Sequence, residues 1–101
     1  MLICIDAGHC LSTPGKRCLK SIDLNETREW VLNSRVANKL EAILAGYSCQ
    51  TMRVDDVTGQ RAVTLSQRVA AANRARADVY LSIHHNAGIN GGSGGGIVAY
   101  V

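Results

Sequence analysis

The sequence has no apolar run long enough to cross a membrane, and only one proline among its 101 residues. A transmembrane helix needs about 20 consecutive apolar residues, so no membrane span is expected. With 47% hydrophobic and 19% charged residues, the composition is that of an ordinary globular protein and not of a disordered chain. A chain of this length suffices for one domain, residues 1–101, and is too short for two.

Extended basic tracts and a secretion signal are also lacking. The formal net charge is +3, but only Lys16, Arg17 and Lys20 form a local basic cluster. No aromatic residues accompany this cluster in the way typical of nucleic-acid binding, so nucleic acid is not an expected partner. The chain opens with a strand-like segment instead of a basic and apolar leader with a cleavage site. This predicts either a cytoplasmic product or release by another route.

The four cysteines form no C-x-x-C pair. Cys4 and Cys49 lie within expected strands, where a buried free thiol is the common state. Cys10 and Cys18 remain an alternative: they are expected to pair only in an oxidising compartment.

What the sequence does contain is an alternation of strand and helix patterns. Apolar segments predict strands at residues 2–6, 48–54 and 80–84, with a fourth beginning at 97–101. Helices are expected between them, at 25–45 and 64–77. This order predicts an α/β fold built on an open, mostly parallel twisted sheet with flanking helices.

Both expected helices carry start signals. Asp23-x-x-Glu26 and Thr64-x-x-Gln67 match the capping-box pattern, in which two side chains satisfy free amide groups at the helix start. The first helix also carries an apolar stripe, which predicts its buried face. The residues of this stripe are Leu32, Val36, Leu40, Ile43 and Leu44.

Histidines follow two of the expected strands. His9 comes after the first strand and His84 closes the third. Ligand sites in open α/β sheets form at the carboxyl ends of the strands, so the two imidazoles are expected to share one crevice. Two imidazoles and a carboxylate, with a fourth position open to water, are typical of catalytic zinc sites. Glu26 and Glu29, early in the first expected helix, are the candidate carboxylates.

Four motifs together resemble the zinc-dependent N-acetylmuramoyl-L-alanine amidases of the family-3 type. The resemblance covers essentially the whole chain, in order. Its motifs are IDAGH after the first strand, ETREWVLNSRVANKL on the first helix, TLSQRVAAANRARAD on the second and YLSIHHNAG on the third strand. It implies hydrolysis of the peptidoglycan amide between N-acetylmuramic acid and L-alanine, as in bacterial cell-wall hydrolases and phage endolysins.

The resemblance also implies which residues bind Zn²⁺. The metal histidines fall on His9 and on His84, not on His85, and Glu29 fits the spacing of the family's glutamate while Glu26 does not. Glu26 is instead expected to cap the helix with Asp23.

Three further residues are expected near the metal. His85 is interpreted as a residue at the rim or behind the ligands, and Asn86 as a cleft residue. Asp6 is expected to orient either the loop or a ligand histidine. The glycine-rich stretch Asn86 to Gly96 is expected to border the cleft.

The general base of the family is a glutamate on a late strand. The last acidic residue here is Asp78, so this base is expected beyond Val101 and the domain is expected to lack its C-terminal part. An alternative follows, namely a metal-binding but catalytically silent module or an inactive amidase fragment. The absence of a leader favours release of a phage-type endolysin.

Two other chemistries fit the sequence less well. NGGSGGG invites a nucleotide-binding interpretation, but it follows the third strand, whereas the dinucleotide fingerprint lies between the first strand and its helix. Ser82 and His84 invite a serine-hydrolase interpretation, but the G-x-S-x-G elbow is missing.

Overall fold

The computed structural model describes residues 1–87 and 95–101. Its elements are, in order, β1 Leu2–Ala7, α1 Glu29–Leu44, β2 Gln50–Arg53, α2 Leu65–Arg74 and β3 Val79–Ile83. The strands form one sheet in the order β2-β1-β3, and both pairings are parallel. This confirms the predicted α/β fold with its parallel sheet.

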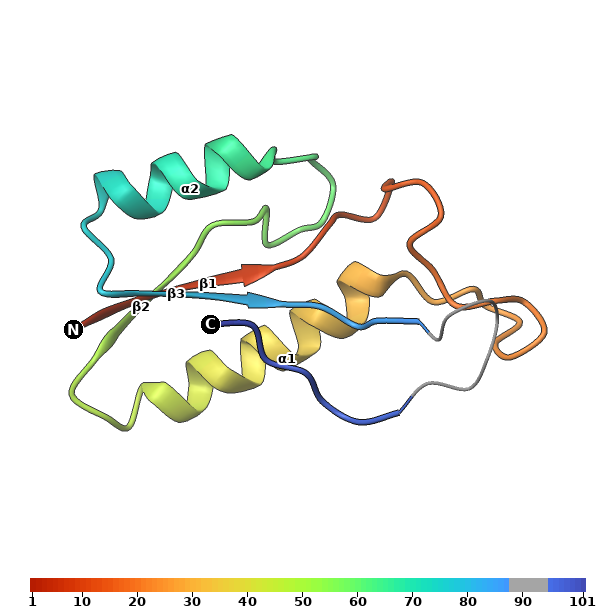
Figure 1. Ribbon diagram of the computed structural model, residues 1–101, viewed down its shortest axis with the longest axis horizontal. Coiled ribbons are helices and arrows are strands. Elements are labelled where there is room, and N and C mark those ends of the chain that lie inside the picture. Colours follow the sequence, from red (N-terminus) through yellow and green to blue (C-terminus); the bar gives the residue numbers. More distant parts are fainter. Residues whose placement is uncertain (88–94) are drawn as a thin grey trace.

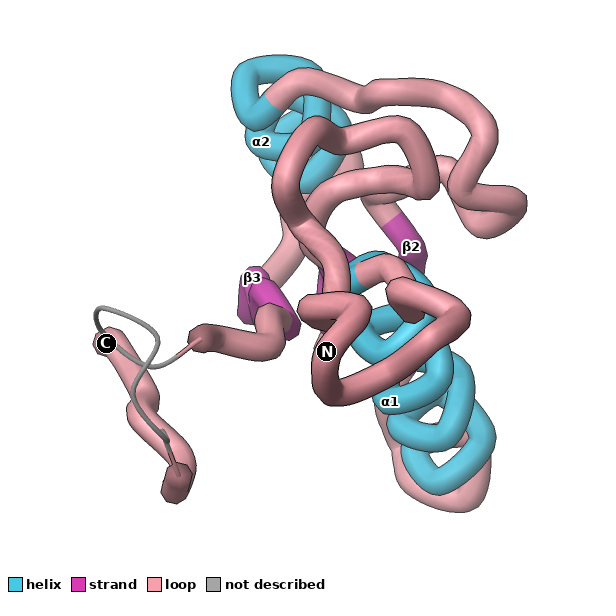
Figure 2. Tube along the Cα trace, turned by 90° about the vertical axis from the view of Figure 1, so that its right-hand side faces the viewer, coloured by secondary structure: helices cyan, strands magenta, loops and turns pink. Residues whose placement is uncertain are grey.

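The two helices cover opposite faces of the sheet, as Figures 1 and 2 both show. Successive side chains of a strand point to opposite faces. Accordingly, Ile5 and Ala7 of the central strand pack in the cluster that includes α1, while Cys4, next to Ile5, packs in the cluster that includes α2. Burial on both faces explains why residues 2–5 of β1 are all apolar.

Helix α1 begins at Glu29, later than the sequence predicts. The Asp23 carboxylate accepts hydrogen bonds from the amides of Asn25 and Thr27, which closes a turn before the helix. Glu26 has a left-handed φ of 49° and pairs with Arg17 at 3.3 Å. The expected Asp23–Glu26 capping box is therefore wrong: an aspartate closes a local turn as readily as it caps a helix.

The predicted buried stripe of α1 is only partly correct. Leu40 and Leu44 pack against the core, but Val36 and Ile43 are 44% and 62% exposed. The helix is turned so that a different set of side chains faces the sheet: Trp30, Asn33, Ser34 and Ala37. Hydropathy does not foresee this rotation because two of these four residues are polar.

Helix α2 confirms its predicted start. The Thr64 hydroxyl accepts from the Gln67 amide, and the Gln67 side chain accepts from the Thr64 amide, so the capping box is complete. In the described part of the chain, no helix is both long enough and apolar enough to span a bilayer.

The fourth strand expected at residues 97–101 is wrong. These residues are described, are exposed to solvent and belong to no strand of the sheet. A strand needs a neighbour for its backbone hydrogen bonds, and the described sheet ends at β3 on this side.

All four cysteines are free thiols, so the alternative Cys10–Cys18 disulfide is not formed. Cys10 is buried, and its sulfur lies 3.4 Å from the hydroxyls of both Ser12 and Thr13. Cys4 is buried in β1, as expected, whereas Cys49 precedes β2.

Candidate metal centre

Parallel pairing brings the two histidine-bearing loops to the same sheet edge. Ala7 and Ile83 are paired at the carboxyl ends of β1 and β3, and the Gly8 amide still donates to the Ile83 carbonyl at 3.0 Å. His84 therefore leaves β3 beside the turn that carries His9. Their rings lie edge to face with centroids 4.9 Å apart.

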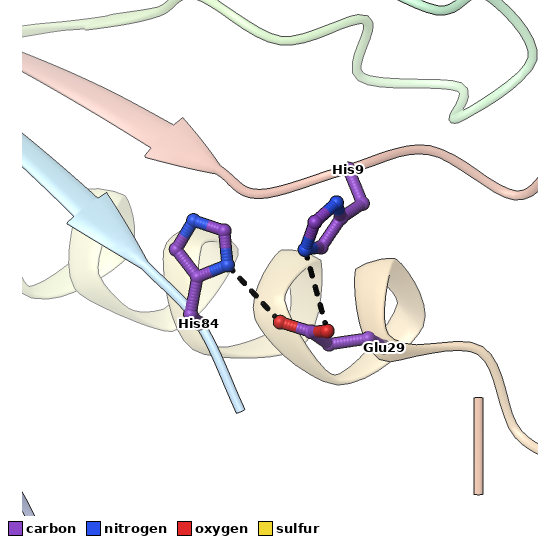
Figure 3. A group of neighbouring side chains, drawn as sticks. All are labelled: His9, Glu29 and His84. Atoms are coloured by element: carbon purple, nitrogen blue, oxygen red, sulfur yellow. Dashed lines mark hydrogen bonds and ion pairs between the residues drawn. The ribbon is translucent and has the colours of Figure 1, made fainter. Parts of the chain in front are cut away.

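Glu29, the first residue of α1, lies between the two rings (Figure 3). One carboxylate oxygen is 3.4 Å from His9 Nε2, and the other is 3.1 Å from His84 Nδ1. The Glu29 side chain is 11% exposed, against 22% for His9 and 47% for His84. The group is thus buried on the helix side and open on the side of His84.

These three side chains fit a zinc ion by chemistry and spacing. Each offers one ligand atom, and the three atoms lie within 4.8 Å of one another. Zinc binds imidazole nitrogen and carboxylate oxygen at roughly 2.0–2.2 Å, so two of its ligands lie at most about 4.4 Å apart. Both separations from Glu29 already meet that limit.

A buried amide holds Glu29 in place. Asn33, one turn along α1 and fully buried, donates to Glu29 at 3.3 Å and to the Gly8 carbonyl at 3.1 Å. Its oxygen accepts from His85 Nδ1 at 2.7 Å, and the His85 amide donates to Glu29 at 3.1 Å. His85 thus lies behind Glu29, while Asn86 is exposed.

The electrostatics favour the protonation states that a metal requires. Burial lowers the pKa of His9, and the Glu29 charge only partly opposes this effect. The lowered pKa favours a neutral imidazole. Burial raises the pKa of Glu29, but the hydrogen bonds from His85 and Asn33 and the charge interaction with His9 outweigh it, so the net pKa is lowered. Neutral histidine and ionised glutamate are the forms that bind metal.

Replacing Asn33 with alanine is expected to lower the free energy of unfolding by about 2 to 4 kcal/mol, because it leaves the Gly8 carbonyl and His85 Nδ1 without their partner. Urea denaturation of the metal-free protein measures the loss. Asn38, exposed on the same helix, is the matched control, and Asn38→Ala is expected to cost under about 1 kcal/mol. Equal losses for the two variants would contradict the anchoring role of Asn33.

The side chain of Asp6 lies on the face of β1 that is covered by α2. Its carboxylate forms an ion pair with Arg68 at 2.5 Å and accepts from the hydroxyls of Tyr80 at 2.7 Å and Ser82 at 3.2 Å. None of these hydrogen bonds goes to a histidine ring. Since the Ser82 hydroxyl donates to Asp6, the serine-hydrolase alternative gains no support.

A cavity of about 350 Å³ opens beside the histidines. The end of β1 and its turn form one wall, and residues at the start of α2 form the other. The lining residues include His9, Cys10, Val63, Leu65, Arg68 and His84. Residues 88–94 of the glycine-rich stretch, expected to border this cleft, lie outside the described residues.

Sequence reasoning assigned no role to two of these residues. Asn33 fits the spacing from Glu29, but by its residue type it is an ordinary polar helix residue. Arg68, by its residue type, is expected to be exposed. Both are buried. The one available signal for Arg68 was its place one turn after the Thr64 cap, on a helix whose start faces the carboxyl end of the sheet.

Comparison with known proteins gives the family. Residues 3–101 match the family model described as N-acetylmuramoyl-L-alanine amidase, and the chain belongs to this family. No match was found among curated proteins.

Solved structures of such amidases have the same fold. The structure of an N-acetylmuramoyl-L-alanine amidase from Clostridium difficile 630 has a TM-score of 0.79 at 30% identity, over 94% of this chain and 48% of that one. The catalytic domain of CwlV, an N-acetylmuramoyl-L-alanine amidase from Bacillus (Paenibacillus) polymyxa var. colistinus, has a TM-score of 0.75 at 27% identity, over 91% and 49%. An amidase of Nostoc punctiforme has a TM-score of 0.72 at 28% identity, over 89% and 46%. The chain therefore spans about half the length of these proteins.

Proposed function

We propose that this chain carries the zinc-binding part of a peptidoglycan amidase, which hydrolyses the amide between N-acetylmuramic acid and L-alanine of the stem peptide. The observation that carries the proposal is that His9, Glu29 and His84 come together from two strand ends and one helix start. Their ligand atoms lie within 4.8 Å of one another. Family membership supplies the reaction class and the substrate.

The proposed ligands are His9, Glu29 and His84. A zinc ion held there supplies Lewis-acid activation of water and of the scissile carbonyl. Glu29 contributes the one negative charge of the set, and Asn33 and the His85 amide hold its carboxylate in place. The partly exposed ring of His84 and the neighbouring cavity keep one side of the group accessible to water and substrate.

The general base is proposed to be a glutamate outside this sequence. The reaction needs a group that takes a proton from water and passes it to the leaving amine. Among the described residues that line the cavity, Asp6 is the one acidic residue, and its carboxylate is occupied by Arg68, Tyr80 and Ser82. The same observation favours a second candidate function, a metal-binding module that binds cell wall without cleaving it.

Zinc content and cell-wall hydrolysis test this proposal. The purified 101-residue protein is expected to hold about one zinc per chain and to release no new alanine amino groups from peptidoglycan. A chain extended at Val101 by the C-terminal half of a related amidase is expected to release them. A 101-residue protein that takes up no zinc would contradict the metal site. Zinc uptake with an extended protein that leaves peptidoglycan intact would favour the silent module.

A further inference from the structure

Arg68 is a buried arginine whose two terminal guanidinium nitrogens bind the end of β1 and the turn after it. It lies on α2 and is 5% exposed. Its Nε donates to the Val63 carbonyl at 2.9 Å, and Nη1 pairs with Asp6 at 2.5 Å. Nη1 also donates to the Ala7 carbonyl at 2.9 Å, and Nη2 to the His9 carbonyl at 3.0 Å.

The turn after β1, to which Arg68 donates these hydrogen bonds, has an unusual backbone conformation. His9 has a φ of 66°, in the left-handed region that side chains other than glycine seldom occupy. Such a conformation persists only when the surroundings hold it. The Arg68 bonds to the carbonyls of Ala7 and His9 lie on either side of Gly8, so one planar guanidinium holds the chain at both ends of this turn.

We propose that Arg68 is a positioning residue, which holds the His9 backbone in its left-handed conformation and thereby directs the imidazole toward Glu29. The inference builds on the proposed zinc site, since its consequence is tighter binding of the ion. Asp6 acts through Arg68 in this arrangement: its carboxylate, held in turn by Tyr80 and Ser82, fixes the guanidinium.

Only arginine provides this set of contacts. Its fork of donors reaches one carboxylate and two carbonyls at once, whereas a lysine ammonium is a point charge on a flexible stem. Arg68→Lys is therefore expected to keep the ion pair with Asp6 and to lose the bond to the His9 carbonyl.

The test compares Arg68→Lys with Arg53→Lys. Arg53 is also buried and paired with a carboxylate, Asp55 at 2.7 Å, but none of its hydrogen bonds goes to a site residue. Zinc affinity is measured by competition with a chelator, and unfolding by urea. Arg68→Lys is expected to weaken zinc binding at least tenfold, the lower end of what residues behind metal ligands typically cost. Arg53→Lys is expected to change it less than twofold, even where it destabilises the fold.

A second readout needs no metal. Backbone chemical shifts and the amide–Hα coupling of His9, measured by NMR on zinc-free protein, report its φ angle. Arg68→Lys is expected to move the His9 signals away from left-handed values, while Arg53→Lys leaves them in place. Unchanged His9 signals in Arg68→Lys would overturn the positioning role whether or not the protein binds zinc. Failure of the wild-type protein to bind zinc would count against the proposed function alone.

Should Arg68→Lys fail to fold, the double variant Asp6→Asn, Arg68→Gln replaces it. It removes both charges of the pair, so that no unpaired charge remains in the core. The same loss of zinc affinity and the same shift of His9 are expected. Wild-type affinity together with wild-type His9 signals in this variant would overturn the proposal.

Discussion

Glu29→Gln is expected to lower zinc affinity at least about 100-fold, or about 2.8 kcal/mol. Glutamine has the size of glutamate, but it lacks the negative charge and places an amide nitrogen or a weaker oxygen ligand between the two rings. Carboxylates, in contrast, are established zinc ligands. Fold stability should change by only about 1 kcal/mol, because the glutamine oxygen still accepts from Asn33 and the His85 amide and only the charge in the first turn of α1 is lost. Chelator competition measures the affinity, and urea denaturation of the metal-free protein measures the stability.

Glu26→Gln is the matched control, because sequence reasoning first left both glutamates as candidates. Glu26 pairs with Arg17 on the surface, at 40% side-chain exposure. A surface ion pair contributes little, so zinc affinity and stability are expected to stay near wild-type values. Loss of zinc in Glu26→Gln and its retention in Glu29→Gln would reverse the proposed ligand assignment.

Gly8→Ala is expected to displace His84 and to weaken zinc binding at least tenfold. A Cβ at position 8 would overlap the His84 ring, at 2.6 Å from both ring nitrogens. The ring is half exposed, so we expect the substitution to move the His84 side chain and not the backbone. We therefore expect the loss in zinc affinity without a comparable loss in the free energy of unfolding.

The control for this prediction is Gly46→Ala, just after α1. A Cβ there meets the Ile43 carbonyl oxygen at 3.5 Å, an ordinary van der Waals contact. Zinc affinity is expected to remain unchanged. In an NMR spectrum of zinc-free protein, the His84 ring signals should move in Gly8→Ala and stay in Gly46→Ala. Gly8→Ala with wild-type affinity and unmoved His84 signals would refute the close-packing argument.

Local patterns predicted the elements well where one interaction dominates. The apolar segment around Ile5 predicted a strand buried on both faces, and Thr64-x-x-Gln67 predicted the start of α2 because both capping partners lie within four residues. Asp23-x-x-Glu26 failed although it fits the same pattern, since Asp23 closes a turn that delays the helix to Glu29.

The rotation of α1 could not be predicted from hydropathy. Two polar residues, Asn33 and Ser34, face the sheet while Val36 and Ile43 face solvent. Burying Asn33 is favourable only because the Gly8 carbonyl, Glu29 and His85 satisfy its amide. Two of those partners, Gly8 and His85, lie on other segments of the chain, so no local window contains the information.

The sequence by itself determined the order of strands and helices, their parallel pairing and the three residue types that a zinc site requires. Tertiary structure alone decided which atoms meet. It brought the carboxylate of Glu29, which the family resemblance already favoured over Glu26, between the imidazoles, buried Asn33 beneath them, and directed Arg68 to the carbonyl of His9. The reason is physical: periodicity and capping depend on neighbours within a few residues, whereas these contacts join residues 20 to 59 positions apart. Their geometry exists only once the sheet and both helices have packed.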